Sequence, residues 1–78
     1  MENLALKTLR TSIGMSQFDF GLEVGLDKET AQARISHYET GRRGLPFPVA
    51  VSVVELAKAH KKKLTFEQLY QSEPNVRP

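Results

Sequence analysis

Three glycines divide the first half of the chain into short helical stretches: Gly14, Gly25 and Gly41. The stretch LALKTLRTSI, over residues 4–13, places apolar side chains three and four residues apart, which is the stripe of an amphipathic helix. Two further helical patterns cover residues 17–24 and roughly 28–40, and each ends at a glycine that can adopt the left-handed conformation of a helix exit. Stretches this short predict a bundle of small helices around one core.

The second stretch carries signals for a helix that packs closely against a neighbour. Ser16 is placed to cap its N-terminus, and Asp19 lies near the positive end of the helix dipole. Phe20 and Val24 are one turn apart on the face that we expect to be buried. Gly21 is unfavourable inside a helix, so we expect another backbone to approach it closely.

The third stretch follows a break in which we expect Leu26 to enter the core and Asp27 to cap the next helix. Its 3.6-residue period buries three residues: Ala31, Ile35 and Tyr38. The same period turns a small and polar set outward: Gln32, Ala33, Ser36 and His37. Arg42 and Arg43 follow directly after its glycine, so the stretch ends in a basic corner.

The segment LPFPVAVSVVELAKAH is ambiguous between strand and helix. Its VAVSVV portion alternates and is β-branched, which is typical of a strand. A helix that starts at Pro48 would instead place Val51, Val54 and Ala57 on one side. The rest of the chain offers a strand no partner, so we predict a helix.

The last element has the clearest local signature. Thr65 and Gln68 have the spacing of a capping box, and Leu64 and Leu69 flank them in the positions of a hydrophobic staple. A short helix over residues 66 to about 70 is therefore predicted. Together these patterns predict an all-α domain of five helices.

Length and composition exclude several classes of protein. The 78 residues suffice for one domain, which we expect over residues 1–71, with a frayed tail over residues 72–78. The chain has no cysteine, its two histidines, His37 and His60, lack metal-ligand spacing, and no glycine loop is built to hold phosphate. We therefore expect neither an enzyme nor a metal or cofactor.

The chain also lacks the features of a membrane or secreted protein. No apolar run approaches the ~20 residues that cross a bilayer, and the N-terminus does not have the layout of a secretory signal. We therefore expect a cytoplasmic protein. Because the net charge is only +2, an affinity for nucleic acid must come from where the charges lie.

Two helices joined by a tight glycine-containing break, the second with a small polar outer face, are the pattern of a helix-turn-helix. The segments LKTLRTSIGMSQ, VGLD and RISHYETGRR, followed by a proline, ELAKA and LTFEQLY, together resemble the Cro/C1-type (XRE) helix-turn-helix family of DNA-binding regulators. This resemblance covers residues 4–70. It implies a compact, lambda-repressor-like domain, over residues 1–71, whose third helix enters the major groove of double-stranded DNA.

The resemblance also implies a biological setting. Members of this family are commonly dimers on a two-fold related operator, so we expect a homodimeric transcriptional repressor of bacterial or phage type, located at the nucleoid. No membrane or small-molecule ligand is expected. The rival hypothesis is a protein-interaction module, antitoxin-like or an adaptor, that keeps the fold.

Roles carry over to individual positions. The family pattern places DNA-backbone contacts at three residues: Gln17, Arg42 and Arg43. It places base contacts at four: Gln32, Ala33, Ser36 and His37. Thr30 is a second-tier DNA contact, and Arg34 either reaches DNA or pairs on its own surface. Arg10 and Glu39 match an arginine and a glutamate that form a structural ion pair between the first and third helices of many relatives.

The chain departs from the family pattern in three places. The segment from Gln17 to Glu39 is roughly one helical turn longer than usual, with the addition around Lys28–Thr30, so it either lengthens the third helix or enlarges the turn. Phe18 and Leu22 are apolar where relatives are polar, and they either pack under the added turn or form a partner surface.

The third departure lies at the end of the fourth helix. His60 and Lys61 stand where relatives often carry leucine and glycine, so we expect a different helix exit. The run from Lys61 to Lys63 resembles a nucleic-acid patch, but lysines at a helix C-terminus also complement the negative end of the dipole. We favour the dipole interpretation.

Overall fold

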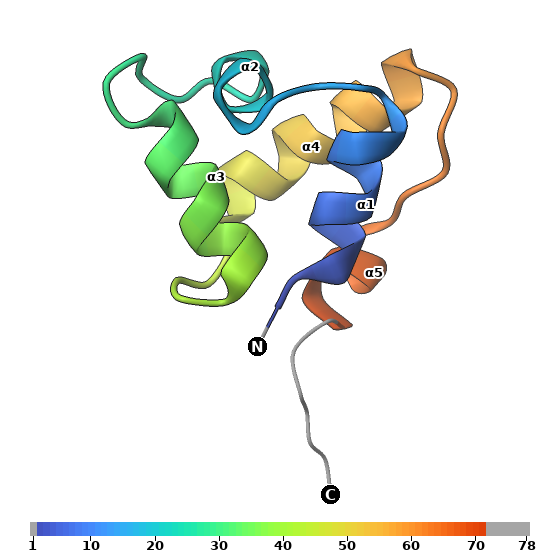
Figure 1. The fold of residues 1–78 in the computed structure, drawn as a ribbon. Helices are drawn as coiled ribbons and strands as arrows, with labels where there is room; N and C mark the ends of the chain where they lie inside the picture. The colour runs from blue at the N-terminus through green and yellow to red at the C-terminus, as the bar shows by residue number, and fades with distance from the viewer. Residues whose placement is uncertain (1, 72–78) are drawn as a thin grey trace, which may run out of the picture.

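The computed structural model describes residues 2–71, which form five α-helices and no strand (Figure 1). In chain order they are α1 (Leu4–Ser12), α2 (Gln17–Glu23), α3 (Ala31–Thr40), α4 (Phe47–Ala59) and α5 (Phe66–Gln71). The prediction of an all-α chain is thereby confirmed for this range. None of these helices has the length and apolar character to cross a membrane. The tail expected over residues 72–78 lies outside the described residues.

All five helices meet in one core. Its five largest fully buried side chains come one from each helix: Leu6, Phe20, Ile35, Val53 and Leu69. Burial of a side chain of this size stabilises the fold by about 1.5–3 kcal/mol relative to exposure. No helix can therefore leave the bundle without exposing a large apolar group.

The ambiguous valine-rich segment forms α4, as predicted, but its buried side differs from the expected one. The residues that enter the core are Val49, Ala50, Val53 and Ala57. Val54 is partly buried beside them, whereas Val51 is rotated by about 200° from Val49 and lies on another side of the helix. The helix also begins at Phe47, so Pro48 occupies its second position. Valines on nearly every face made the buried side impossible to choose from the pattern.

The N-terminal caps predicted for α2 and α5 are present. The Ser16 hydroxyl accepts a hydrogen bond of 3.0 Å from the Asp19 amide at the start of α2. At α5 the Gln68 amide donates to the Thr65 hydroxyl at 3.1 Å, and the Thr65 amide donates to Gln68 Oε1 at 3.0 Å, which completes the capping box. Leu64 is partly buried against the core that contains Leu69, as a hydrophobic staple requires.

Two long-range hydrogen bonds fasten α5 to the rest of the domain. Asn3 Nδ2 donates to the Leu69 carbonyl at 3.1 Å, and the Tyr70 hydroxyl donates to the Leu45 carbonyl at 3.0 Å. Desolvation by burial raises the pKa of Tyr70 above its ordinary value of 10.0. The phenol therefore remains a donor throughout the neutral pH range.

The exit of α4 adopts the conformation that a glycine would favour, although a lysine occupies it. Lys61 has a φ of +58°, in the left-handed region. Its amide donates to the Lys58 carbonyl at 3.0 Å, and the Lys62 amide donates to the Ala57 carbonyl at 2.8 Å. These two bonds are those of a Schellman motif, which usually places glycine at this position.

We expect Lys61→Gly to raise the free energy of unfolding by about 0.5–1 kcal/mol, because glycine removes the left-handed strain but adds entropy to the unfolded chain. Urea denaturation followed by circular dichroism measures this difference. Lys61→Ala keeps the strain while removing the charge, so it serves as the control. An equal gain from the alanine variant would show that charge, not backbone strain, limits stability at this corner.

Candidate nucleic-acid interface

Helices α2 and α3 meet at a backbone contact that leaves no room for a side chain. A Cβ atom built on Gly21 would lie 2.6 Å from the Ala31 Cβ and 2.8 Å from the Ala31 carbonyl oxygen. The close approach predicted at Gly21 is thereby confirmed. The contact joins the middle of α2 to the first residue of α3, so it fixes where α3 begins.

The connection between α2 and α3 absorbs the additional residues. Gly25 adopts a φ of +93°, and the Leu26 amide then donates to the Gly21 carbonyl at 2.9 Å. Leu26 packs partly buried against the core, as predicted. The residues Lys28–Thr30 form a turn, and α3 begins only at Ala31. The residues that the resemblance marks as an addition therefore belong to the turn and not to the helix.

The cap expected from Asp27 is wrong. The N-cap of α3 is Thr30, and no side chain makes a capping hydrogen bond there. The Asp27 carbonyl accepts from the Thr30 amide at 3.0 Å. This is a turn bond that spans three residues, so Asp27 starts the turn and lies too early in the chain to cap α3.

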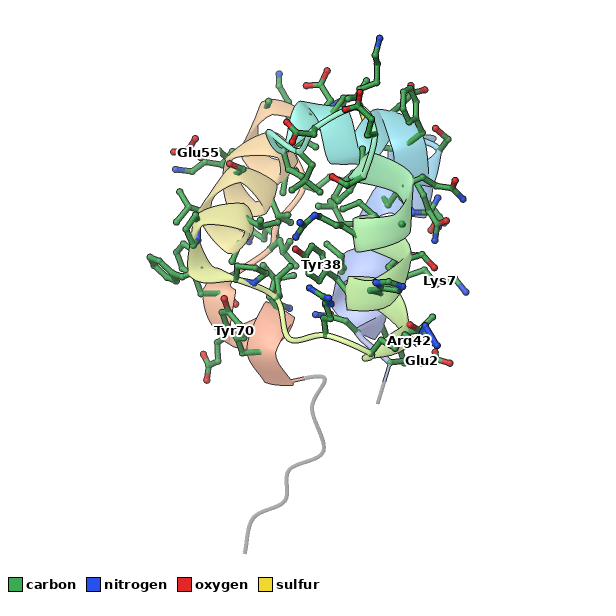
Figure 2. All side chains as sticks on the ribbon, turned by 90° about the vertical axis from the view of Figure 1, so that its left-hand side faces the viewer. Glu2, Lys7, Tyr38, Arg42, Glu55 and Tyr70 are labelled. Atoms are coloured by element: carbon green, nitrogen blue, oxygen red, sulfur yellow. The ribbon has the colours of Figure 1, made fainter. Side chains whose placement is uncertain are left out.

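The outer face of α3 lies at one edge of the molecule. In Figure 1 α3 stands at the left, and Figure 2, which looks onto that side, has it in front. The three residues predicted to be buried, Ala31, Ile35 and Tyr38, are all in the core. Of the proposed base-facing contacts on α3 and at its start, three are exposed: Gln32, Ala33 and Arg34. Three others are half-buried: Thr30, Ser36 and His37.

The C-terminal end of α3 carries two free cations. Gly41 takes a φ of +83°, and the Arg43 amide donates to the His37 carbonyl at 3.3 Å, which turns the chain just past the helix. Arg42 and Arg43 are exposed, and among the described residues neither makes an ion pair. The single carboxylate on α3 is Glu39, which is buried, so α3 offers no exposed negative charge beside them.

The predicted ion pair between Arg10 and Glu39 is present. Arg10 Nε lies 2.6 Å from Glu39 Oε2, and Arg10 Nη2 donates to Glu39 Oε1 at 3.2 Å. Arg10 Nη1 also donates to the Met15 carbonyl at 2.8 Å. Glu39 is only 4% exposed, so this fork of donors compensates a carboxylate that water does not reach.

Gln17 joins the same network. Its Nε2 donates to Glu39 Oε1 at 3.1 Å, so Glu39 holds the beginning of α2 as well as α1. No local pattern signals this bond, because its partners are 22 residues apart and belong to different helices. The contact of Gln17 with the DNA backbone remains a prediction.

Asn3 is a second residue that sequence reasoning missed. Its side-chain oxygen accepts from the Leu6 backbone amide at 3.1 Å and caps α1. Its backbone N–H donates to the Glu39 carbonyl at 2.8 Å. An asparagine directly before LALK has the place of an N-cap, and this was the available signal. Both the side chain and the backbone of Glu39 are therefore anchored.

The apolar pair on α2 lies outside the core. Phe18 is 38% exposed and Leu22 is 40% exposed, and neither belongs to the core cluster. This exposure favours the second of the two explanations offered for them, a partner surface. They form an apolar patch, one turn apart, on the surface of α2.

The described residues contain no cluster of three or more histidine, cysteine or acidic side chains that could hold a metal ion. Compared with known proteins, the chain matches no protein-family model, and no curated protein has a significantly similar sequence. A functional assignment must therefore be argued from the α2–α3 pair and from its surface.

Proposed function

We propose that this chain is a helix-turn-helix protein that binds double-stranded DNA sequence-specifically and acts as a dimeric transcriptional repressor. Helix α2, the connection over residues 24–30 and α3 form the motif, with α3 in the major groove. One observation carries this proposal: α3 presents an outer face without exposed carboxylates and is followed by two exposed arginines that make no ion pair in the described part of the chain.

The size of the side chains on α3 suits a major groove. That groove is ~12 Å wide and admits an α-helix, provided that the side chains facing the bases are short. Ala33 and Ser36 are short, while Gln32 and His37 supply hydrogen-bond donors and acceptors. Gln32 pairs by geometry with the N6 and N7 atoms of adenine.

The charges outside this face suit the phosphate backbone. Arg42 and Arg43 follow the end of α3, so phosphates flanking the groove come within their reach. Gln17 lies at the start of α2, next to the Arg10–Glu39 pair. The buried Glu39 carboxylate of α3 also holds the beginning of α2. The base-reading and phosphate-binding groups therefore stand on a single rigid frame.

A dimer is supported by an exposed aromatic pair at the beginnings of α4 and α5. Phe47 and Phe66 stack with ring centroids 5.3 Å apart, although they are 61% and 38% exposed. Exposed apolar groups that cluster in this way are typical of an interaction surface. We propose that a second copy of the chain covers them on a two-fold related operator.

The division of roles is testable by two sets of variants on duplexes selected from a random DNA pool. Arg42→Ala with Arg43→Ala should weaken binding to every sequence by a similar factor and reduce the salt slope by about 2 for each protomer. Gln32→Ala or His37→Ala should instead relax preference at one base-pair position, by about 1–3 kcal/mol. Fluorescence anisotropy with the selected duplexes measures both effects.

The matched control is Lys62→Ala with Lys63→Ala, which removes the same charge from the segment after α4. It should leave DNA affinity nearly unchanged, because that segment and α3 lie on opposite sides of Figure 1. If all these variants weakened binding alike, the assignment of separate reading and phosphate roles would be wrong.

The exposed apolar patch favours one second candidate. An antitoxin-like or adaptor protein would keep the fold and bind a protein through Phe18 and Leu22. In that case Phe18→Asp with Leu22→Asp abolishes partner binding or changes the oligomeric state without loss of stability. In a DNA regulator that does not use the patch, the same variant binds duplexes as the parent protein does.

A further inference from the structure

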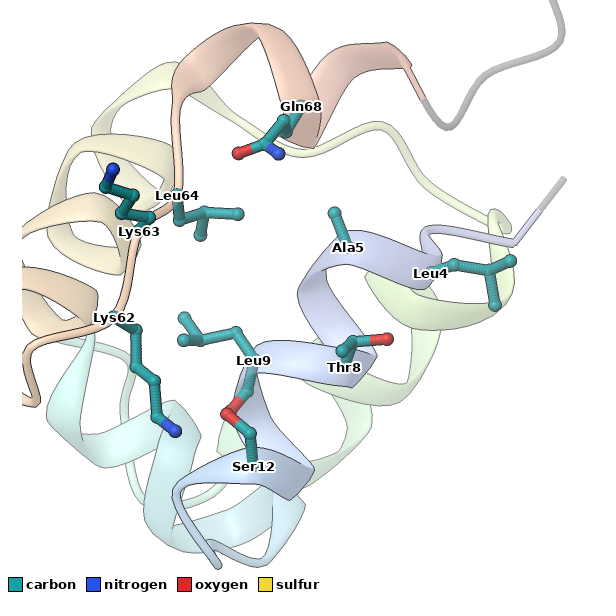
Figure 3. A pocket seen from close by; sticks show the side chains of 9 residues that line it. All are labelled: Leu4, Ala5, Thr8, Leu9, Ser12, Lys62, Lys63, Leu64 and Gln68. Carbon is teal, nitrogen blue, oxygen red and sulfur yellow. The ribbon is translucent and has the colours of Figure 1, made fainter.

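A groove lies on the side of the molecule away from the outer face of α3. It runs between α1 and the segment that joins α4 to α5, and it encloses about 390 Å³ (Figure 3). Its apolar lining includes Leu9, which belongs to the core, and Leu64, which packs against the core. At one end Leu4 is 59% exposed, so apolar surface continues beyond the groove.

The wall formed by α1 suits the close approach of another helix. Ala5, Thr8 and Ser12 line it at spacings of three and four residues, so short side chains follow one face of α1. From Leu4 to Ser12 this wall is about 12 Å long, or roughly two helical turns. A partner helix can therefore lie along it with an apolar residue from each turn in the groove.

The opposite wall is positively charged. Lys62 and Lys63 line the groove, are exposed, and make no ion pair among the described residues. In Figure 3 the Lys62 side chain extends toward the Ser12 end of α1. Within residues 2–71, no acidic side chain lines the groove. Gln68 Oε1 is engaged in the capping box, which leaves its NH₂ group as a further donor on this wall.

We propose that this groove binds an acidic amphipathic helix of a protein partner. Leucine-sized residues one turn apart enter the groove against Leu9 and Leu64, and carboxylates on the flank of that helix pair with Lys62 and Lys63. The charge selects an anionic partner, and the two-turn wall of short side chains selects a helix. The proposal does not depend on DNA binding, because it uses a different face of the molecule.

The test uses the full chain, labelled with ¹⁵N, and a synthetic helical peptide of about 14 residues with leucines at i, i+4 and i+7 and glutamates beside them. A matched peptide carries lysine at each glutamate position. The acidic peptide should shift the amide resonances of Thr8, Ser12, Leu64 and Gln68 and bind with a Kd below about 1 mM. The basic peptide should leave these resonances unmoved.

Two variants locate the contact. Lys62→Glu with Lys63→Glu should lower the affinity for the acidic peptide by about tenfold or more. Thr8→Phe should abolish binding by filling the groove. Lys28→Glu with Lys58→Glu reverses the same charge away from the groove and should change the affinity by less than about threefold. All five substituted positions are exposed, and circular dichroism verifies that each variant is folded.

Several results would overturn the proposal. Equal binding of the two peptides, shifts confined to the Phe47 and Phe66 surface, or no binding at about 1 mM would each do so. Dodecanoate below its micelle concentration is the probe for a small anionic amphiphile. If it moved the groove resonances while the acidic peptide did not, the groove would be a small-molecule site instead.

Discussion

Arg10→Ala is expected to lower the free energy of unfolding by about 3–5 kcal/mol. The substitution removes two of the three side-chain hydrogen bonds that Glu39 accepts, and this carboxylate is only 4% exposed. Only the hydrogen bond from Gln17 then remains to offset the desolvation of the buried Glu39 carboxylate. A domain of 78 residues has a total stability of about 4–12 kcal/mol, so this variant is expected to lose at least about a quarter of the stability of the fold.

The double variant separates the value of the pair from the penalty of an orphaned charge. Arg10→Met with Glu39→Met should be less destabilised than Arg10→Ala, because no buried charge remains. Urea denaturation followed by circular dichroism measures the wild type and both variants. Lys7→Ala is the control, because Lys7 is exposed on α1 and makes no ion pair with any residue from 2 to 71. If Arg10→Ala cost no more than Lys7→Ala, the pair would contribute nothing to the fold.

The same double variant also tests whether the network positions the proposed DNA-binding groups. A folded protein without Glu39 no longer holds Gln17 against the end of α3. We therefore expect weaker binding to a selected duplex, although the charge on the outer face of α3 is unchanged. Full DNA affinity in a folded double variant would limit the network to stability alone.

Gly21→Ala should destabilise the protein by about 1–3 kcal/mol or more, through overpacking between α2 and α3. The added methyl group would lie 2.6 Å from the Ala31 Cβ and 2.8 Å from the Ala31 carbonyl oxygen, so one helix must move. The movement displaces the beginning of α3, which carries the first proposed base contacts. Thermal and urea denaturation measure the loss of stability, and NMR amide shifts along α3 report the movement.

Two companion variants distinguish this clash from a general effect of alanine. Gly44 has open space around it, so Gly44→Ala should not destabilise the protein. Ala31→Gly, added to Gly21→Ala, removes the closer contact but leaves the carbonyl, so it should restore only part of the loss. Equal effects of Gly21→Ala and Gly44→Ala would contradict the close approach.

The features that sequence reasoning found are those encoded within a few residues. The Ser16 cap, the Thr65–Gln68 capping box and the buried face of α3 each depend on local spacing, and all three are present. The close contact at Gly21 was also predictable, because a glycine that weakens a helix needs a compensating contact.

What could not be predicted depended on packing between distant segments. The sequence left open whether the residues Lys28–Thr30 lengthened α3 or the turn, since one full turn preserves the helical phase either way. The buried side of α4 was hidden by valines on several faces. The bond from Gln17 to Glu39 joins two helices whose relative placement no local pattern specifies.

The central claim, that α3 and its arginines bind duplex DNA, is tested most directly by the salt dependence of binding. The wild-type chain is titrated into a random-sequence fluorescent duplex at several salt concentrations, and log K is plotted against log [salt]. Contacts from Arg42 and Arg43 predict measurable binding at low salt and a linear plot with a slope of about −2 for each protomer. Absence of binding at low salt, or an affinity that salt does not change, would contradict the account and favour a protein-binding module.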